Sequence, residues 1–149
     1  MHAHHRGMDV VEPAAPAPRV RKDPAAQLAA PHIARELRTV VAMLRIHCAD
    51  RHGDRPRDNT DQLCAECSGL RDYARRRLAL CTYGADKPTC ANCRIHCYGP
   101  KPREAMRQVM RYAGPRMLWR HPWLALMHLC VDGRRPAPLR PNERSGSVT

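Results

Sequence analysis

The sequence contains no phenylalanine, and only two tryptophans and four tyrosines occur among its 149 residues. So few flat aromatic side chains argue against a surface on which nucleic-acid bases stack. Acidic residues are also scarce, with 14 Asp and Glu against 26 Lys and Arg, and the formal net charge is +12. Such a chain either attracts polyanions, nucleic acid among them, or simply carries a solvated arginine-rich surface.

Long apolar runs are absent as well. No stretch reaches the ~18 uninterrupted apolar residues of a membrane-spanning helix, and the N-terminus lacks the apolar segment of a secretory signal. The longest apolar run, 117–131, is interrupted by Arg120, His121, Pro122 and His128. We therefore expect no membrane partner and a cytoplasmic location, where the eight cysteines stay reduced instead of forming disulfides.

Composition divides the chain into three parts. Residues 1–30 are rich in proline and alanine without apolar periodicity, and residues 133–149 have the same character with a basic excess. We expect a disordered N-terminal arm and a disordered basic tail there. Residues 31–132 carry the periodic apolar pattern and all eight cysteines, which predicts one helical metal-binding domain.

Apolar periodicity predicts two helices in the first half of this domain. Apolar side chains recur at helical spacing from 31 to 49, with arginines on the opposite side. A second helix is expected over 61–80, with Asp61 as its N-cap. Because the segment 81–102 is broken by glycines and prolines, we expect an irregular loop there.

Two further helices are expected after this loop. The third begins near Pro102 and stops at Gly114 and Pro115, since glycine and proline commonly end helices. The last covers 123–130. No segment shows the alternation of a strand, so the predicted fold class is all-α, a small domain of about four helices with cysteine-rich, metal-binding loops.

Cysteine and histidine residues follow one another at spacings typical of metal ligands. Two Cys-x2-Cys pairs are present, a pattern that lets two thiolates bind one tetrahedral ion. A continuous helix from Cys67 to Cys81 would separate these residues by about 21 Å, whereas thiolates on one zinc ion lie about 4 Å apart. The helix therefore divides the ligands into two sets.

The first set suits zinc, because three thiolates and one imidazole are a common zinc environment. An antiparallel pairing of the first two helices would bring its members together: Cys48, His52, Cys64 and Cys67. The second set suits zinc or an iron–sulfur cluster equally. Its members are Cys81, Cys90, Cys93 and Cys97, with His96 as a substitute.

Each candidate also has a purely structural interpretation. Cys48 and Cys67 lie on helix faces and could be small buried hydrophobic residues. Cys130, in an apolar segment without a paired cysteine, is expected to pack in the core. His47 is expected on the helix surface and not as a ligand.

A basic stretch near residue 115 is the other candidate site. Its members could bind an anion or contact a partner: Arg111, Arg116, Arg120 and His121. Alternatively, the stretch is a turn between two helices, shaped by Gly114 and Pro115, with His121 capping the last helix. The residues alone favour neither interpretation.

The segment 35–132 resembles the nitrous oxide-stimulated promoter family of small bacterial proteins. The matching stretches are RELRTVVAMLRIHC, LCAECSGLRDYARRRLALC, GADKPTCANCRIHCY and REAMRQVMRYAGPRMLWRHP. The resemblance implies a cytoplasmic protein linked to nitrosative or nitric-oxide stress. The family pattern includes both ligand sets, but not Cys130, and His47 replaces a more usual tyrosine. The family name describes a gene context and supplies no reaction.

Three functions follow as hypotheses. The first is a non-enzymatic, cysteine-rich metal-binding protein (zinc, an iron–sulfur cluster, or both) of the nitric-oxide response. The second is a regulator that binds nucleic acid or another protein, with zinc supporting its helices and arginines contacting phosphate. The third is a redox or repair enzyme with an iron–sulfur cluster. The chain shows no nucleophile–base pair, phosphate-binding glycine loop or paired carboxylates, so an enzyme is the least favoured.

Overall fold

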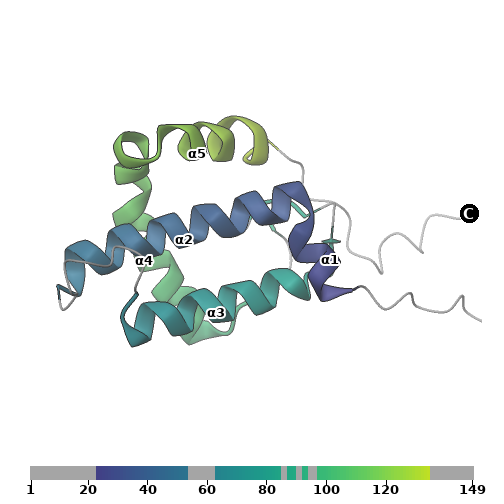
Figure 1. Ribbon diagram of the computed structural model, residues 1–149, viewed down its shortest axis with the longest axis horizontal. Helices are drawn as coiled ribbons and strands as arrows, with labels where there is room; N and C mark the ends of the chain where they lie inside the picture. The colour runs from purple at the N-terminus through teal and green to yellow at the C-terminus, as the bar shows by residue number, and fades with distance from the viewer. Residues whose placement is uncertain (1–22, 54–62, 85–86, 90–91, 94–96, 135–149) are drawn as a thin grey trace, which may run out of the picture.

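The computed structural model describes residues 23–53, 63–84, 87–89, 92–93 and 97–134. Most of the predicted arm and tail, residues 1–22 and 135–149, lie outside this part of the chain. Within it every regular element is helical, as predicted (Figure 1). None of these helices is both long and apolar enough to cross a membrane.

The helical region begins earlier than the sequence predicts. Helix α1 (Pro24–Ala29) lies inside the expected N-terminal arm, and the side chain of Asp23 caps it. The buried side chain of Gln27 donates hydrogen bonds to the carbonyl oxygens of Leu78 (2.7 Å) and Cys81 (3.2 Å). A helix of six residues is too short to show apolar periodicity. Contacts far along the chain stabilise it instead.

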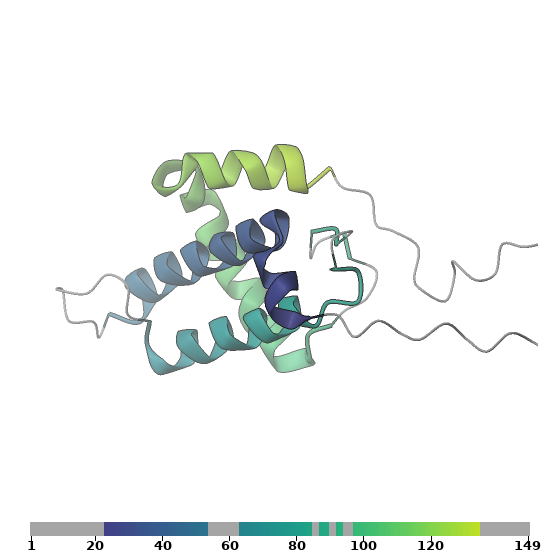
Figure 2. The ribbon, with the colours of Figure 1, turned by 45° about the vertical axis from the view of Figure 1, so that its right-hand side comes forward.

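Helices α2 (Pro31–Arg51) and α3 (Ala65–Ala79) run side by side in opposite directions (Figures 1 and 2). This is the antiparallel pairing expected from the ligand spacing. Helix α2 ends two residues beyond the predicted 49. Helix α3 begins at Ala65 with Cys64 as its N-cap, and the proposed cap Asp61 lies outside the described residues.

Helix α4 (Pro100–Arg120) crosses behind this pair and contacts both members (Figure 2). It continues through Gly114 and Pro115, so the predicted stop at these residues is wrong. Ala113 and Met117, on either side of them, are buried in the core. Their burial keeps the segment helical, although Pro115 cannot donate the usual backbone hydrogen bond.

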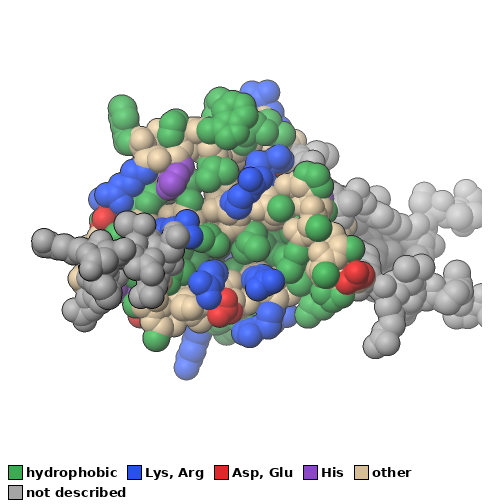
Figure 3. Space-filling view, viewed as in Figure 1, with side chains coloured by type: hydrophobic (Ala, Val, Ile, Leu, Met, Phe, Trp, Pro, Cys, Tyr) green, Lys and Arg blue, Asp and Glu red, His purple; other side chains and the backbone are tan. Residues whose placement is uncertain are grey.

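Helix α5 (Pro122–Met127) follows after a break at His121 and ends in a wider π-helical turn, η2 (His128–Asp132). The prediction that Cys130 packs in the core is wrong, because Cys130 is exposed. Ala125 is buried, whereas larger apolar side chains of this part of the molecule are exposed. These exposed side chains gather on the surface over α5 (Figure 3). The exposed side chains include Trp119, Trp123, Leu126 and Leu129.

The core lies where α2 packs against α3, α4 and α5. Its apolar side chains come mainly from α2 and α4, and methionine and alanine fill the space that larger aromatic residues would otherwise occupy. The buried residues include Val40, Met43, Leu44, Ile46, Ala74, Met106, Val109, Ala113 and Met117. Two metal-ligand candidates, Cys48 and Cys67, belong to the same core. The core therefore holds one end of the candidate site in place.

Candidate metal centre

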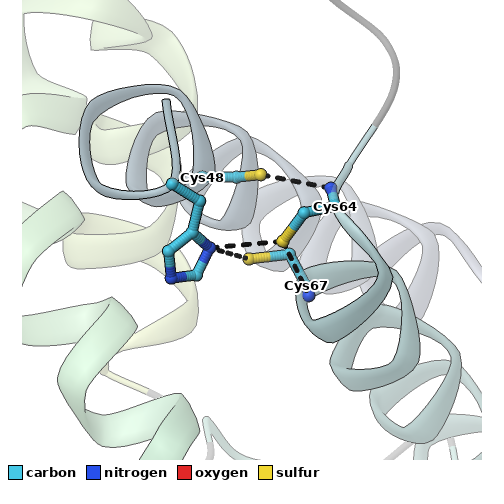
Figure 4. Close-up of side chains that lie close together, drawn as sticks. Cys48, Cys64 and Cys67 are labelled. Atoms are coloured by element: carbon cyan, nitrogen blue, oxygen red, sulfur yellow. Dashed lines mark hydrogen bonds between the residues drawn. The ribbon is translucent and has the colours of Figure 1, made fainter. Parts of the chain in front are cut away.

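The end of α2 and the start of α3 bring four predicted ligands together. Cys48 lies in the last turn of α2 and His52 follows four residues later, which places both on one side of the helix. Cys64 and Cys67 stand at the start of α3. One sulfur or nitrogen atom from each residue lies within 4.8 Å of every other (Figure 4).

The distances within this cluster match those around a tetrahedral ion. The Nδ1 atom of His52 lies 3.2 Å from the Sγ atom of Cys64 and 3.4 Å from that of Cys67. Ligands on one zinc ion would place nitrogen and sulfur about 3.5 Å apart, since the Zn–N and Zn–S bonds are about 2.0 and 2.3 Å. The geometry therefore identifies Nδ1 as the imidazole atom that faces the thiols.

Backbone N–H groups also point at the sulfur atoms. The amide of Cys64 donates to the Sγ atom of Cys48 at 3.3 Å, and the amide of Cys67 donates to the Sγ atom of Cys64 at 3.5 Å. The second bond is the N-terminal cap of α3. These donors and the positive end of the helix dipole stabilise thiolates, the form in which cysteine binds metal.

The cluster is closed to solvent on its core side. Cys48 is 0 % exposed and Cys67 is 2 % exposed, while Cys64 and His52 are half-buried. Burial, followed by the neighbouring thiols of Cys64 and Cys48, raises the pKa of Cys67 well above its usual value. Without a metal, Cys67 is a neutral thiol at pH 7. A bound cation would offset the cost of ionising it.

Four protein ligands of this kind fit a metal ion of the zinc type. Three thiolates and one imidazole complete a tetrahedral coordination shell, leaving no position for a substrate. Such closed sites serve structure: the ion cross-links the chain segments that supply its ligands. Here it would join the C-terminal end of α2 to the N-terminal end of α3.

Residues beside the ligands hold the imidazole in position. The ring of His47 packs edge-on against the ring of His52, with 5.2 Å between centroids, and against Tyr112 on its other side at 5.6 Å. Burial lowers the pKa of His47, so its ring is neutral. His47 was expected on the helix surface, but it is half-buried. It contacts a ligand without belonging to the ligand group.

Glu66 is a residue that the sequence analysis missed. Its carboxylate lies 4.0 Å from the Nε2 atom of His52, on the side of the ring away from the thiols. Carboxylates that hydrogen-bond to this nitrogen orient metal-bound histidines, but the exposed side chain of Glu66 lies beyond hydrogen-bonding distance here. Its place between the two cysteines of the Cys64-x2-Cys67 pair is the signal that could have suggested it.

The second ligand set is separated from the first by the length of α3, as predicted, because α3 is continuous from Ala65 to Ala79. Three of its members, Cys81, Cys93 and Cys97, line one cavity. Burial raises the pKa of Cys97, and its thiol neighbours Cys81 and Cys93 add to the shift. The remaining candidates, Cys90 and His96, lie outside the described residues.

Comparison with known proteins identifies the family of this chain. Residues 31–142 match the family described as nitrous oxide-stimulated promoter. The chain belongs to this family. The match covers both ligand sets and every helix from α2 to α5.

One curated relative is the uncharacterized protein YgbA of Escherichia coli (strain K12). The two sequences are 54 % identical over 71 residues, which is 48 % of this chain and 60 % of the relative. The matched segment thus spans less than two thirds of the relative's length. No solved structure matches the chain.

The basic stretch shared with the family contacts a carboxylate of its own chain. The guanidinium of Arg120 lies 3.3 Å from Asp50, and that of Arg116 lies 3.9 Å from the same side chain. Arg116 also covers the ring of Tyr112 at 3.7 Å. Arg111 is exposed. The alternative of a turn at Gly114 and Pro115 is wrong, because both residues are helical.

The break between α4 and α5 instead lies at His121. Its N–H donates to the carbonyl oxygen of Met117, and its own carbonyl oxygen accepts from the amide of Ala125. His121 thus ends one helix and starts the next through its backbone, while its side chain makes no capping hydrogen bond. Binding of an external anion at this stretch stays a prediction.

Proposed function

We propose that the chain is a metal-binding protein of the cell's response to nitrosative stress, with zinc at Cys48, His52, Cys64 and Cys67. The observation that carries this proposal is the clustering of these four ligand atoms within 4.8 Å. The family description, which refers to stimulation by nitrous oxide, supports the physiological context. A cytoplasmic location, where thiols stay reduced, belongs to the same proposal.

The first site is assigned a structural role. The sulfur atoms of Cys48 and Cys67 are buried among core residues, and the four residues would supply all four tetrahedral positions of a bound ion. A metal held in this way stabilises the fold, because the unfolded chain offers no preformed site. Removing it is expected to release the start of α3 from the end of α2.

The second set is assigned the responsive role, with zinc or an iron–sulfur cluster as its metal. Cys81, Cys93 and Cys97 are half-buried and line a cavity, so a small molecule reaches them more easily than the buried sulfur atoms of Cys48 and Cys67. An S-nitrosothiol can transfer its nitroso group to a cysteine thiolate. The new S–N bond forms as the donor's S–N bond breaks, and the electron pair leaves with the donor thiolate. The product carries no charge and binds metal more weakly.

Metal content before and after treatment with S-nitrosoglutathione tests this division. The full chain is loaded anaerobically, counted for zinc, iron and sulfide, treated, desalted and counted again. We expect the metal of the second set to be lost and one zinc ion per chain to stay. Unchanged metal content, or loss of the zinc ion first, would contradict the assignment.

Two variants assign the loss to its site. Cys81→Ser/Cys97→Ser should lack the metal of the second set and contain only the zinc ion of the first set. Treatment with S-nitrosoglutathione should therefore remove no metal from this variant. Cys130→Ser is the matched control, because Cys130 is exposed and lies in neither set. It should lose the same amount of metal as the wild-type protein.

Exposed arginines support a second candidate, nucleic-acid binding. Arg75, Arg76 and Arg77 are exposed on α3, and Arg107 and Arg111 are exposed on the neighbouring α4. Contacts from such side chains to phosphate would make binding fall steeply as salt rises. Filter binding of duplex DNA and of RNA between 50 and 200 mM salt tests this function. Absence of binding at the lower salt concentration would rule it out.

A further inference from the structure

A cavity lies between α3, α4 and the segment that follows α3. Its volume is about 390 Å³, within the range of sites that bind small molecules. Part of its wall is apolar, formed by Val40, Leu78, Met106 and Met110. Zinc at the first ligand set would not fill this space, since that set lies at the other end of α3.

Cationic side chains dominate the charged part of the wall. Arg77 comes from α3, and Arg103 and Arg107 come from α4. The carboxylate on the wall, Glu36, accepts two hydrogen bonds from the buried ammonium group of Lys87, at 2.6 and 2.8 Å. Because these two charges offset each other, the three arginines leave the cavity with a positive potential.

The arginines differ in how far they are already engaged. Arg77 lies over the ring of Tyr73 and donates to its hydroxyl oxygen, and Arg107 pairs with the exposed Glu104 at 3.3 Å. Among the residues that the structure describes, the guanidinium of Arg103 has no hydrogen-bonding partner. Arg103 is therefore the side chain most available to an incoming anion.

We propose that this cavity binds a small organic anion, with its apolar body against the methionine and leucine wall and its carboxylate, sulfonate or phosphate group at the arginines. Arg103 and Arg107 bind the anionic group. This site goes beyond the proposed function, since it requires no bound metal. It places its ligand beside Cys81, Cys93 and Cys97.

The probe is 1-anilinonaphthalene-8-sulfonate, an apolar molecule with one anionic group, titrated into the full chain and followed by fluorescence. We expect saturation at one equivalent. Arg103→Glu/Arg107→Glu should weaken binding at least tenfold, because it replaces attraction with repulsion at the mouth. Arg75→Glu/Arg76→Glu is the matched control, since it makes the same change in charge outside the cavity. It should bind as the wild type does.

The exposed apolar residues over α5 are the competing site for such a dye. Trp119→Ser/Trp123→Ser removes their largest side chains, which are 89 % and 68 % exposed, and should leave binding unchanged. Binding that survives reversal of Arg103 and Arg107, or that disappears with the tryptophans, would overturn the proposal.

Metal counts on the same samples keep these results distinct from failure of the proposed function.

Discussion

Cys67 has to be a thiolate to bind a metal, and it is buried in a place that favours the neutral thiol. Its pKa in the metal-free fold is raised, first by burial and then by its thiol neighbours. The unfolded chain has no such environment, so its cysteines ionise near pH 8.5 to 9. The residue therefore links metal binding, folding and pH.

The sign of this linkage gives a prediction for the metal-free protein. Below about pH 8.5 the thiol is protonated in both states and the full stability is present. Above that pH the unfolded state loses its proton and the folded state keeps it, so stability falls. We expect a loss of about 1 kcal/mol between pH 7.5 and 9.5, measured by urea unfolding in excess chelator. Cys67→Ser should lack this component of the slope, and an identical slope in both proteins would contradict the assignment.

At the scale of elements, α4 shows that packing can override a sequence signal. Gly114 and Pro115 would end an isolated helix, yet buried neighbours on both sides keep it continuous. A Cβ atom added at Gly114 meets nothing within 4 Å, and the same holds for Gly69 in α3. Gly69 is therefore an ordinary helical position with an unused preference for alanine. Gly114 is different, because a Cβ atom there would crowd the ring of the following Pro115, and this disfavours the helical conformation for the residue before proline.

Alanine at Gly69 should stabilise the protein. We expect Gly69→Ala to raise the free energy of unfolding by about 1 kcal/mol, measured by thermal and denaturant unfolding. Gly133→Ala is the contrasting variant, because its Cβ atom would lie 2.9 Å from the carbonyl oxygen of Leu129. It should destabilise. Destabilisation by Gly69→Ala would mean that α3 is not a regular helix at this position.

One ion pair ties the C-terminal turn to the first long helix. The guanidinium of Arg35 in α2 donates to both carboxylate oxygens of Asp132, at 2.6 and 3.0 Å, and both side chains are largely buried. This pair raises the pKa of Arg35 further. The bidentate geometry makes it a strong anchor for η2.

Removing the carboxylate would leave a charged group without its partner. Asp132→Ala is expected to lower the free energy of unfolding by about 2 kcal/mol, measured by denaturant unfolding. Arg38→Ala, an exposed arginine on the same helix, is the control and should change stability by less than about 0.5 kcal/mol. A double-mutant cycle with Arg35→Ala should show strong coupling, and additive effects would contradict the anchoring role.

At the scale of the whole molecule, the sequence predicts what depends on spacing and misses what depends on distant contacts. The positions of Cys48, His52, Cys64 and Cys67 follow from two amphipathic helices of known length, so their grouping could be argued in advance. Helix α1 could not, because hydrogen bonds from Gln27 to the end of α3 hold it. The exposure of Cys130 depends on how η2 packs against α2. The local sequence around Cys130 does not reveal this packing.

The central claim is that the first ligand set binds zinc. A zinc ion bound there would fix the end of α2 against the start of α3. X-ray absorption spectroscopy at the zinc edge tests it most directly, on the full chain carrying Cys81→Ser, Cys93→Ser and Cys97→Ser so that one site remains. The account predicts one zinc ion per chain with three sulfur neighbours at about 2.3 Å and one nitrogen at about 2.0 Å. A shell without sulfur, or no zinc retained after dialysis, would contradict it.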